Sequence, residues 1–63
     1  MDSIGARIKY IRKLHELNQV SFAQAIGISQ GTLSELESNK FSPSVETLIQ
    51  LHQKFEVDYI GFY

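Results

Sequence analysis

The sequence predicts an all-α domain of five short helices. Apolar residues recur every three or four positions along successive stretches, which is the spacing of one face of a helix. A serine, asparagine or aspartate stands before each stretch, and the side chains of these residues cap helix N-termini. The 63 residues are predicted to form a single domain, 1–63, and helices are the natural way for so short a chain to bury a core.

The first predicted helix begins with Asp2 or Ser3 as its cap and ends near Glu16. Glycine is the usual residue where a chain leaves a helix, and the sequence does not explain how a glutamate ends the helix at a low cost in free energy. The apolar face of this helix is expected to consist of Ile4, Ile8, Ile11 and Leu14.

The segment 19–38 is the most informative part of the chain, because its small and apolar residues fall at the offsets that two short crossed helices require. Phe22 and Ile26 are four residues apart and form one apolar stripe, and Ala23 beside them is small enough for a second helix to cross closely. Gly27 tolerates the left-handed backbone that ends a helix. The segment is therefore predicted to be a helix-turn-helix.

The second helix of this pair is predicted to begin after the cap Ser29 and to stop at Asn39, which tolerates a left-handed backbone. Leu33 and Leu36 are three residues apart and are expected to face inward. The opposite edge faces outward and is the candidate reading face, which carries Gln30, Gly31, Ser34 and Glu35.

Two further helices are predicted after the loop 40–43. Ser44 caps the fourth helix, and Asp58 caps a short fifth helix. Tyr59 and Phe62 of the fifth helix are expected to complete the core of so small a domain. The inward face of the fourth helix is expected to comprise Val45, Leu48, Leu51 and Phe55.

A specific run of residues extends through the chain: Leu17, Gln19, Phe22, Ala23, Gly27, Ser29, Leu33, Glu37, Pro43, Ser44 and Leu48. With this run the chain resembles, over nearly its whole length and without gaps, the Cro/C1-type helix-turn-helix family of DNA-binding domains, also called the XRE family. The resemblance implies a compact five-helix fold like that of lambda repressor. It also implies binding to duplex DNA, with no cofactor.

The resemblance further implies that the helix after Ser29 lies in the major groove, where each base pair displays its own pattern of donors and acceptors. Gln30 is the best candidate reader, since its amide can pair bidentately with adenine N6 and N7, and the alternative is a solvated glutamine. Gly31 adds no side chain and permits close backbone approach. Thr32 and Ser34 are expected to contact a thymine methyl group or a phosphate.

Glu35 departs from the family, which usually has a basic or neutral polar residue at this position. Two interpretations are equally open. The carboxylate is repelled by phosphates and weakens non-specific binding, or it accepts from cytosine N4 and specifies that base.

Gln19 opens the first helix of the pair, where the resemblance implies a phosphate contact from its side chain and from the free N–H groups of the helix N-terminus. The other expected phosphate contacts come from residues at caps and in the loop: Asn18, which caps this helix, Ser29, Ser38, Lys40 and Ser42. Glu37 commonly pairs, in the family, with a basic residue at the position of Arg12. That ion pair is expected to be structural and to lock the recognition helix.

The composition gives little support for an enzyme. There is no cysteine, so disulfides, thiolate metal cages and thiol nucleophiles are excluded. His15 and His52 have no Cys, Asp or His at ligand spacing, and His52 is expected at the margin of the core rather than on a metal. No stretch is long enough to span a bilayer and no apolar signal core opens the chain, which predicts a cytoplasmic protein.

The net charge of −1 argues against a highly basic nucleic-acid binder, yet four of the six basic residues lie in the first predicted helix, so the charge is polarised. The predicted function is a prokaryotic or phage transcriptional regulator, most simply a repressor that binds a palindromic operator as a homodimer. Tyr63 and Phe41 are the candidate dimer contacts, and no membrane or small-molecule partner is expected. The alternative is a protein-interaction module on the same fold, such as an antitoxin or anti-repressor, which Glu35, Gly31 and the low charge favour.

Overall fold

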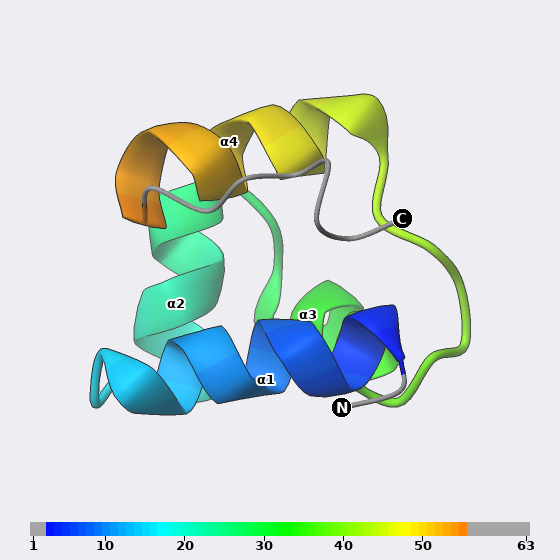
Figure 1. Cartoon of the computed structure of the whole chain (residues 1–63), viewed down its shortest axis with the longest axis horizontal. Helices are drawn as coiled ribbons and strands as arrows, with labels where there is room; N and C mark the ends of the chain where they lie inside the picture. Colours follow the sequence, from blue (N-terminus) through cyan, green and yellow to red (C-terminus); the bar gives the residue numbers. More distant parts are fainter. Residues whose placement is uncertain (1–2, 56–63) are drawn as a thin grey trace.

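A computed structural model describes residues 3–55, and within them the chain forms α1 (Ile4–Leu14), α2 (Gln19–Ile26), α3 (Gln30–Glu37) and α4 (Val45–Phe55). α1 packs against α3, and α2 packs against both α3 and α4. In Figure 1, α2 stands between α4 above and α1 below. The all-α prediction is confirmed, and the predicted fifth helix after Asp58 lies outside the described residues. Across residues 3–55, no helix has the length and apolar character that crossing a membrane requires.

The core of the described residues takes one face from each helix. Its buried apolar side chains, all predicted from their spacing except Ala23, which was predicted as a small residue at the helix crossing, are Ile8, Ile11, Phe22, Ala23, Ile26, Leu33, Leu36, Leu48 and Leu51. Because α2 and α3 both contribute to this cluster, side-chain packing fixes how the two helices cross. The core therefore holds the outward edge of α3 in a defined direction.

Two apolar residues that were assigned to core faces are exposed instead. Leu14 is 64% exposed and Val45 is 72% exposed. The buried face of α1 continues from Ile11 to Arg12 and leaves Leu14 beside it. In α4 the buried face begins at Thr47, so Val45 in the first turn lies outside it. Spacing alone does not show that an arginine or a threonine takes the inward position.

His52 is exposed as well, so its predicted place at the margin of the core is wrong. Phe55 occupies that margin. Its ring stacks on Phe22, with 4.6 Å between the ring centroids, and the ring of His15 meets it edge-on at 4.9 Å. These aromatic contacts anchor the end of α4 to α2 and to the turn that follows α1.

Each helix begins at a polar cap that the sequence predicted, and Ser3, rather than Asp2, caps α1. The side chain of each cap accepts a hydrogen bond from a backbone N–H group that has no partner within the helix, and these bonds fix where α2 and α3 begin. The capping oxygen accepts the backbone N–H three residues further on: Ser3 from Ala6 (3.0 Å), Asn18 from Ser21 (2.8 Å), Ser29 from Thr32 (3.1 Å) and Ser44 from Thr47 (3.1 Å).

The first three helices end in the same way, at a residue with left-handed backbone. These residues are Glu16 (φ 56°), Gly27 (φ 76°) and Asn39 (φ 63°). After α1, the N–H of Leu17 turns back to the carbonyl of Arg12 at 3.2 Å, and the equivalent bond closes the other two helices. This Schellman arrangement suits glycine and asparagine, whereas a glutamate adopts it only with steric strain of about 1–2 kcal/mol.

Replacing Glu16 with glycine is expected to raise the free energy of unfolding by about 0.5–1 kcal/mol, because relief of that strain exceeds the added flexibility of the unfolded chain. Urea titration followed by circular dichroism measures the change. Ala6→Gly, at an exposed position inside α1, is the matched control and should instead lose about 1 kcal/mol. A Glu16→Gly variant no more stable than the starting chain would contradict the strain at this exit.

Candidate nucleic-acid interface

A buried ion pair joins α1 to the last residue of α3. Arg12 Nε donates to Glu37 Oε2 at 2.7 Å, and Arg12 Nη2 donates to Glu37 Oε1 at 3.1 Å. Arg12 Nη1 also donates to the carbonyl of Leu17 at 3.0 Å. The two charged side chains are only 11% and 5% exposed. The pair implied by the family resemblance is therefore present, in the bidentate geometry that gives Arg–carboxylate pairs their strength.

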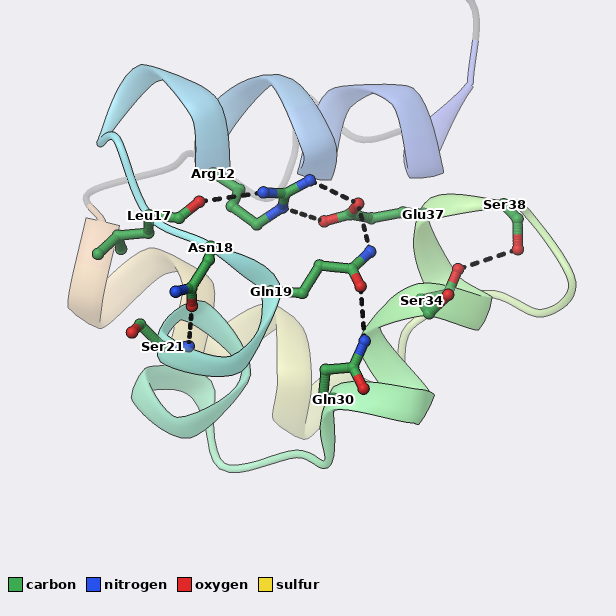
Figure 2. A network of polar contacts seen from close by, with 9 residues as sticks. All are labelled: Arg12, Leu17, Asn18, Gln19, Ser21, Gln30, Ser34, Glu37 and Ser38. Atoms are coloured by element: carbon green, nitrogen blue, oxygen red, sulfur yellow. Dashed lines mark hydrogen bonds and ion pairs between the residues drawn. The ribbon is translucent and has the colours of Figure 1, made fainter.

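Two glutamine amides extend this ion pair to the surface. Gln19 Nε2 donates to Glu37 Oε1 at 3.1 Å, and Gln30 Nε2 donates to Gln19 Oε1 at 2.7 Å. Figure 2 shows these side chains in one continuous chain of hydrogen bonds, with Gln19 lying between Glu37 and Gln30. We call Arg12, Glu37, Gln19 and Gln30 the polar relay.

The sequence singled out every member of the polar relay but not the bonds from Glu37 to Gln19 and on to Gln30. A signal was available, because Gln19 and Gln30 are the first residues of two helices that cross in a helix-turn-helix. Both glutamines directly follow a capping residue, so the backbone from which each side chain extends is held in place. The relay consequently ties the beginning of α3 to the buried ion pair at its end.

The predicted base-reading residues lie on α3, and most of them are open to solvent. Gln30, Gly31, Ser34 and Glu35 are exposed. An added Cβ at Gly31 would meet nothing within 4 Å, so the backbone is accessible there. Thr32 is half-buried, and its Oγ1 accepts a hydrogen bond from Ser29 Oγ at 2.8 Å. Thr32 therefore presents less of its side chain than Ser34 does.

The predicted phosphate-contacting residues lie at helix ends and in the loop after α3. Asn18 and Ser29 are caps, so their side-chain oxygens already accept backbone N–H groups. Ser38 Oγ donates to the carbonyls of Ser34 and Glu35, at 2.9 and 3.2 Å. Lys40 and Ser42 are exposed after the end of α3. The second N–H of Gln19 Nε2 is not used by Glu37 and is the amide proton with which Gln19 can meet an anion.

The exposed charges of α1, of α3 and of the loop after α3 are mixed in sign. Lys9 and Lys13 on α1 are exposed, and Lys40 follows α3. Arg12 is compensated by Glu37 and is almost fully buried, whereas Glu35 places an exposed carboxylate on the outward edge of α3. A phosphate that approaches α3 would therefore be repelled by Glu35, whereas Lys40, which follows the helix, would attract it.

A short helix held across a second helix, with an exposed outward edge, defines a helix-turn-helix domain. The sequence profile of the Helix-turn-helix family matches residues 8–62, and the chain belongs to this Cro/C1-type family of DNA-binding domains.

Two relatives are similar in sequence to most of this chain. It is 44% identical over 57 residues to the antitoxin PezA of Streptococcus pneumoniae, covering 90% of this chain and 36% of PezA. It is 39% identical over 46 residues to the immunity repressor protein of Bacillus phage phi105, covering 73% of this chain and 32% of that protein. The chain thus spans about a third of the length of these two relatives.

A solved structure has the same fold. The P22 c2 repressor protein, crystallised in complex with a synthetic operator, superimposes with a TM-score of 0.85 at 24% sequence identity. The match covers 95% of this chain and 94% of that one. The two chains therefore share one arrangement of helices.

Proposed function

We propose that this chain is the sequence-specific DNA-binding domain of a cytoplasmic prokaryotic or phage transcriptional regulator, acting as a repressor that occupies an operator. One observation carries the proposal: Gln30 is exposed at the start of α3, yet its amide is held through Gln19 by the buried ion pair. A side chain that is already ordered loses less entropy when it binds, and the major groove admits one helix.

The roles in this proposal follow the placement of the residues. The second N–H of Gln19 and the N-terminus of α2 meet phosphate, which sets the register of α3 on the duplex. The remaining phosphate contacts are assigned to Asn18, Lys40 and Ser42, and also to Ser29 and Ser38, whose hydroxyl protons must first turn away from Thr32 Oγ1 and from the carbonyls of Ser34 and Glu35. Base contacts are assigned to Gln30, Gly31, Thr32, Ser34 and Glu35. The ion pair between Arg12 and Glu37 supports the reading helix without touching DNA.

Selection from a pool of randomised duplexes tests the proposal and supplies a preferred site. Gln30→Ala should lose about 1–3 kcal/mol of binding on that site and little on random DNA, because only the base contact is removed. Gln53→Ala makes the same chemical change at an exposed position of α4 and should alter neither affinity. A selection that enriches no sequence would contradict the proposal.

The 44% identity to an antitoxin keeps a second candidate function in view, a module that binds another protein. The exposed carboxylate of Glu35 fits this function, since it faces away from the core on the edge that would otherwise meet phosphates. A salt series separates the two. Binding to DNA gives a steep fall of log affinity with log salt, because each phosphate contact releases counterions, and a protein-binding module has almost no affinity for DNA to lose.

Replacing Glu35 with glutamine is expected to strengthen binding to random duplex DNA, because it removes one negative charge from the edge of α3 while keeping the shape of the side chain. Fluorescence anisotropy at low salt measures the effect. Glu46→Gln, on the exposed start of α4, is the charge-matched control. If Glu35 also accepts from cytosine, the variant loses preference at one base pair, and no change in either quantity would place Glu35 outside the groove.

The operator is proposed to be palindromic and bound by a homodimer, because one domain with a glycine and a glutamate on its reading edge is expected to bind too weakly alone. The half-sites should then lie about 34 Å apart, one turn of the duplex. Inserting about 5 base pairs between them should abolish tight binding by turning one half-site to the far side. Phe41, 45% exposed, is a candidate contact, and Tyr63 lies outside the described residues. Indifference to the insertion would indicate a monomeric reader.

A further inference from the structure

The direction of every hydrogen bond in the polar relay is fixed by chemistry. Arg12 carries donors only, and the carboxylate of Glu37 carries acceptors only. Gln19 must therefore turn its Nε2 towards Glu37, as the 3.1 Å contact shows, and its Oε1 the other way. Gln30 must then give its own Nε2 to that oxygen, which it does at 2.7 Å. The ion pair thus determines which way round each amide lies.

The fixed orientation decides what Gln30 can offer to a base. One N–H of its Nε2 is engaged by Gln19, which leaves the other N–H beside Oε1, one donor next to one acceptor. In Figure 2 the oxygen of Gln30 points away from Gln19. Adenine presents a donor at N6 and an acceptor at N7, so the two edges match. Guanine presents two acceptors, O6 and N7, and meets the oxygen of Gln30 unfavourably.

The ion-pair end of the polar relay is buried, so it keeps one arrangement and sets the orientation of the amides at the exposed end. The side chains of Glu37 and Arg12 are 5% and 11% exposed, Gln19 is half-buried, and Gln30 is exposed. An exposed glutamine by itself turns its amide over freely, because the two orientations have the same shape. Reversing Gln30 here would place two oxygens or two NH₂ groups against each other somewhere along the relay. The buried ion pair therefore fixes the orientation of the Gln19 amide and, through it, that of the exposed Gln30 amide.

We propose that Glu37, acting through Gln19, is a specificity-determining positioning residue that makes α3 read adenine in preference to guanine. The inference rests on the proposed function, because it requires Gln30 to contact a base. It adds to that function the buried carboxylate that fixes the orientation of the Gln30 amide, and hence its discrimination of adenine from guanine.

Gln19→Lys is the variant that reverses the polarity without removing the ion pair. Its ammonium group carries donors only, so it pairs with Glu37 as Gln19 Nε2 does and gives another N–H to Gln30. The Oε1 of Gln30 must turn to accept that N–H. Its NH₂ group then faces the groove with two donors, which suit the O6 and N7 acceptors of guanine.

The measurement uses the duplex selected by the unmodified 63-residue chain in four versions, which carry the four possible base pairs at one position and are otherwise identical. That position is the one at which selection with Gln30→Ala loses its preference. The unmodified chain should favour adenine over guanine by about 5- to 150-fold, and Gln19→Lys should invert the preference. The added charge strengthens binding to all four duplexes alike, so the ratio does not depend on it.

Two controls bracket the effect. Gln19→Met removes both hydrogen bonds at similar volume and should shrink the adenine-to-guanine ratio without inverting it. Gln53→Lys adds the same charge on exposed α4 and should leave the ratio unchanged. Thermal unfolding followed by circular dichroism establishes that each variant is folded.

The outcomes separate the inference from the function on which it rests. If Gln30→Ala keeps every base preference of the unmodified chain, the role of Gln30 in DNA reading fails. If Gln30→Ala loses one preference but Gln19→Lys still favours adenine there, the polarity inference is overturned and the function stands. A preference of the unmodified chain for guanine at that position overturns it as well. Should Gln19→Lys not fold, an unchanged ratio in Gln19→Met has the same consequence.

Discussion

Replacing Glu37 with alanine is expected to destabilise the domain by about 3–5 kcal/mol, because it leaves the guanidinium of Arg12 buried without its carboxylate. A chain of 63 residues has about 3–9 kcal/mol of stability in total. The variant should therefore keep at most about 6 kcal/mol of stability, and it should be largely unfolded without denaturant if the unmodified domain has less than about 5 kcal/mol. Urea titration and thermal unfolding, both followed by circular dichroism, measure the loss.

The double variant Arg12→Met with Glu37→Met is the control that separates a stranded charge from lost packing. It replaces both charged groups by apolar side chains of similar volume, which commonly restores the stability that a single deletion removes. The double variant should fold, yet Gln19 and Gln30 would have no fixed polarity and the base preference should fall. A loss below about 1 kcal/mol in Glu37→Ala would show that the pair does not hold α1 and α3 together.

Features that depend on the chemistry of one residue could be predicted from the sequence. A serine or asparagine before an apolar stripe caps a helix in any surroundings, and Ser29 and Asn18 do so here. The same holds for Gly27 and Asn39, whose tolerance of left-handed backbone marks the ends of α2 and α3. The core followed from spacing because period and burial agree wherever only apolar residues compete for the inward positions.

Features that depend on which side chains meet across helices could not be predicted in the same way. Arg12 takes an inward position on α1 because Glu37 compensates its charge, and this displaces Leu14 from the predicted core face. The bond between Gln19 and Gln30 requires the crossing of α2 and α3 to be known. The left-handed backbone of Glu16 could not be predicted either, because the packing on either side of it imposes this strained end on α1.

Replacing Gly5 with alanine is expected to destabilise the domain by about 1–3 kcal/mol, even though alanine is the better helix former by about 1 kcal/mol. The added Cβ would lie 2.5 Å from the carbonyl oxygen of Leu36 and 2.7 Å from that of Glu37. Both atoms belong to the backbone of α3, so relief requires α1 and α3 to separate. The N–H of Gly5 would also move away from Asn39 Oδ1, to which it donates at 2.9 Å.

Gly31→Ala is the matched control for this prediction, because it makes the same change in α3 where an added Cβ meets nothing within 4 Å. It should gain up to about 1 kcal/mol, so urea titrations of the two variants are expected to shift the midpoint in opposite directions. Since α1 holds the end of α3 through Gly5, Gly5→Ala should also weaken binding to the selected duplex at temperatures where it remains folded. A Gly5→Ala variant as stable as the unmodified chain would mean that the two helices can part without loss, and the close contact would then not determine where α3 lies.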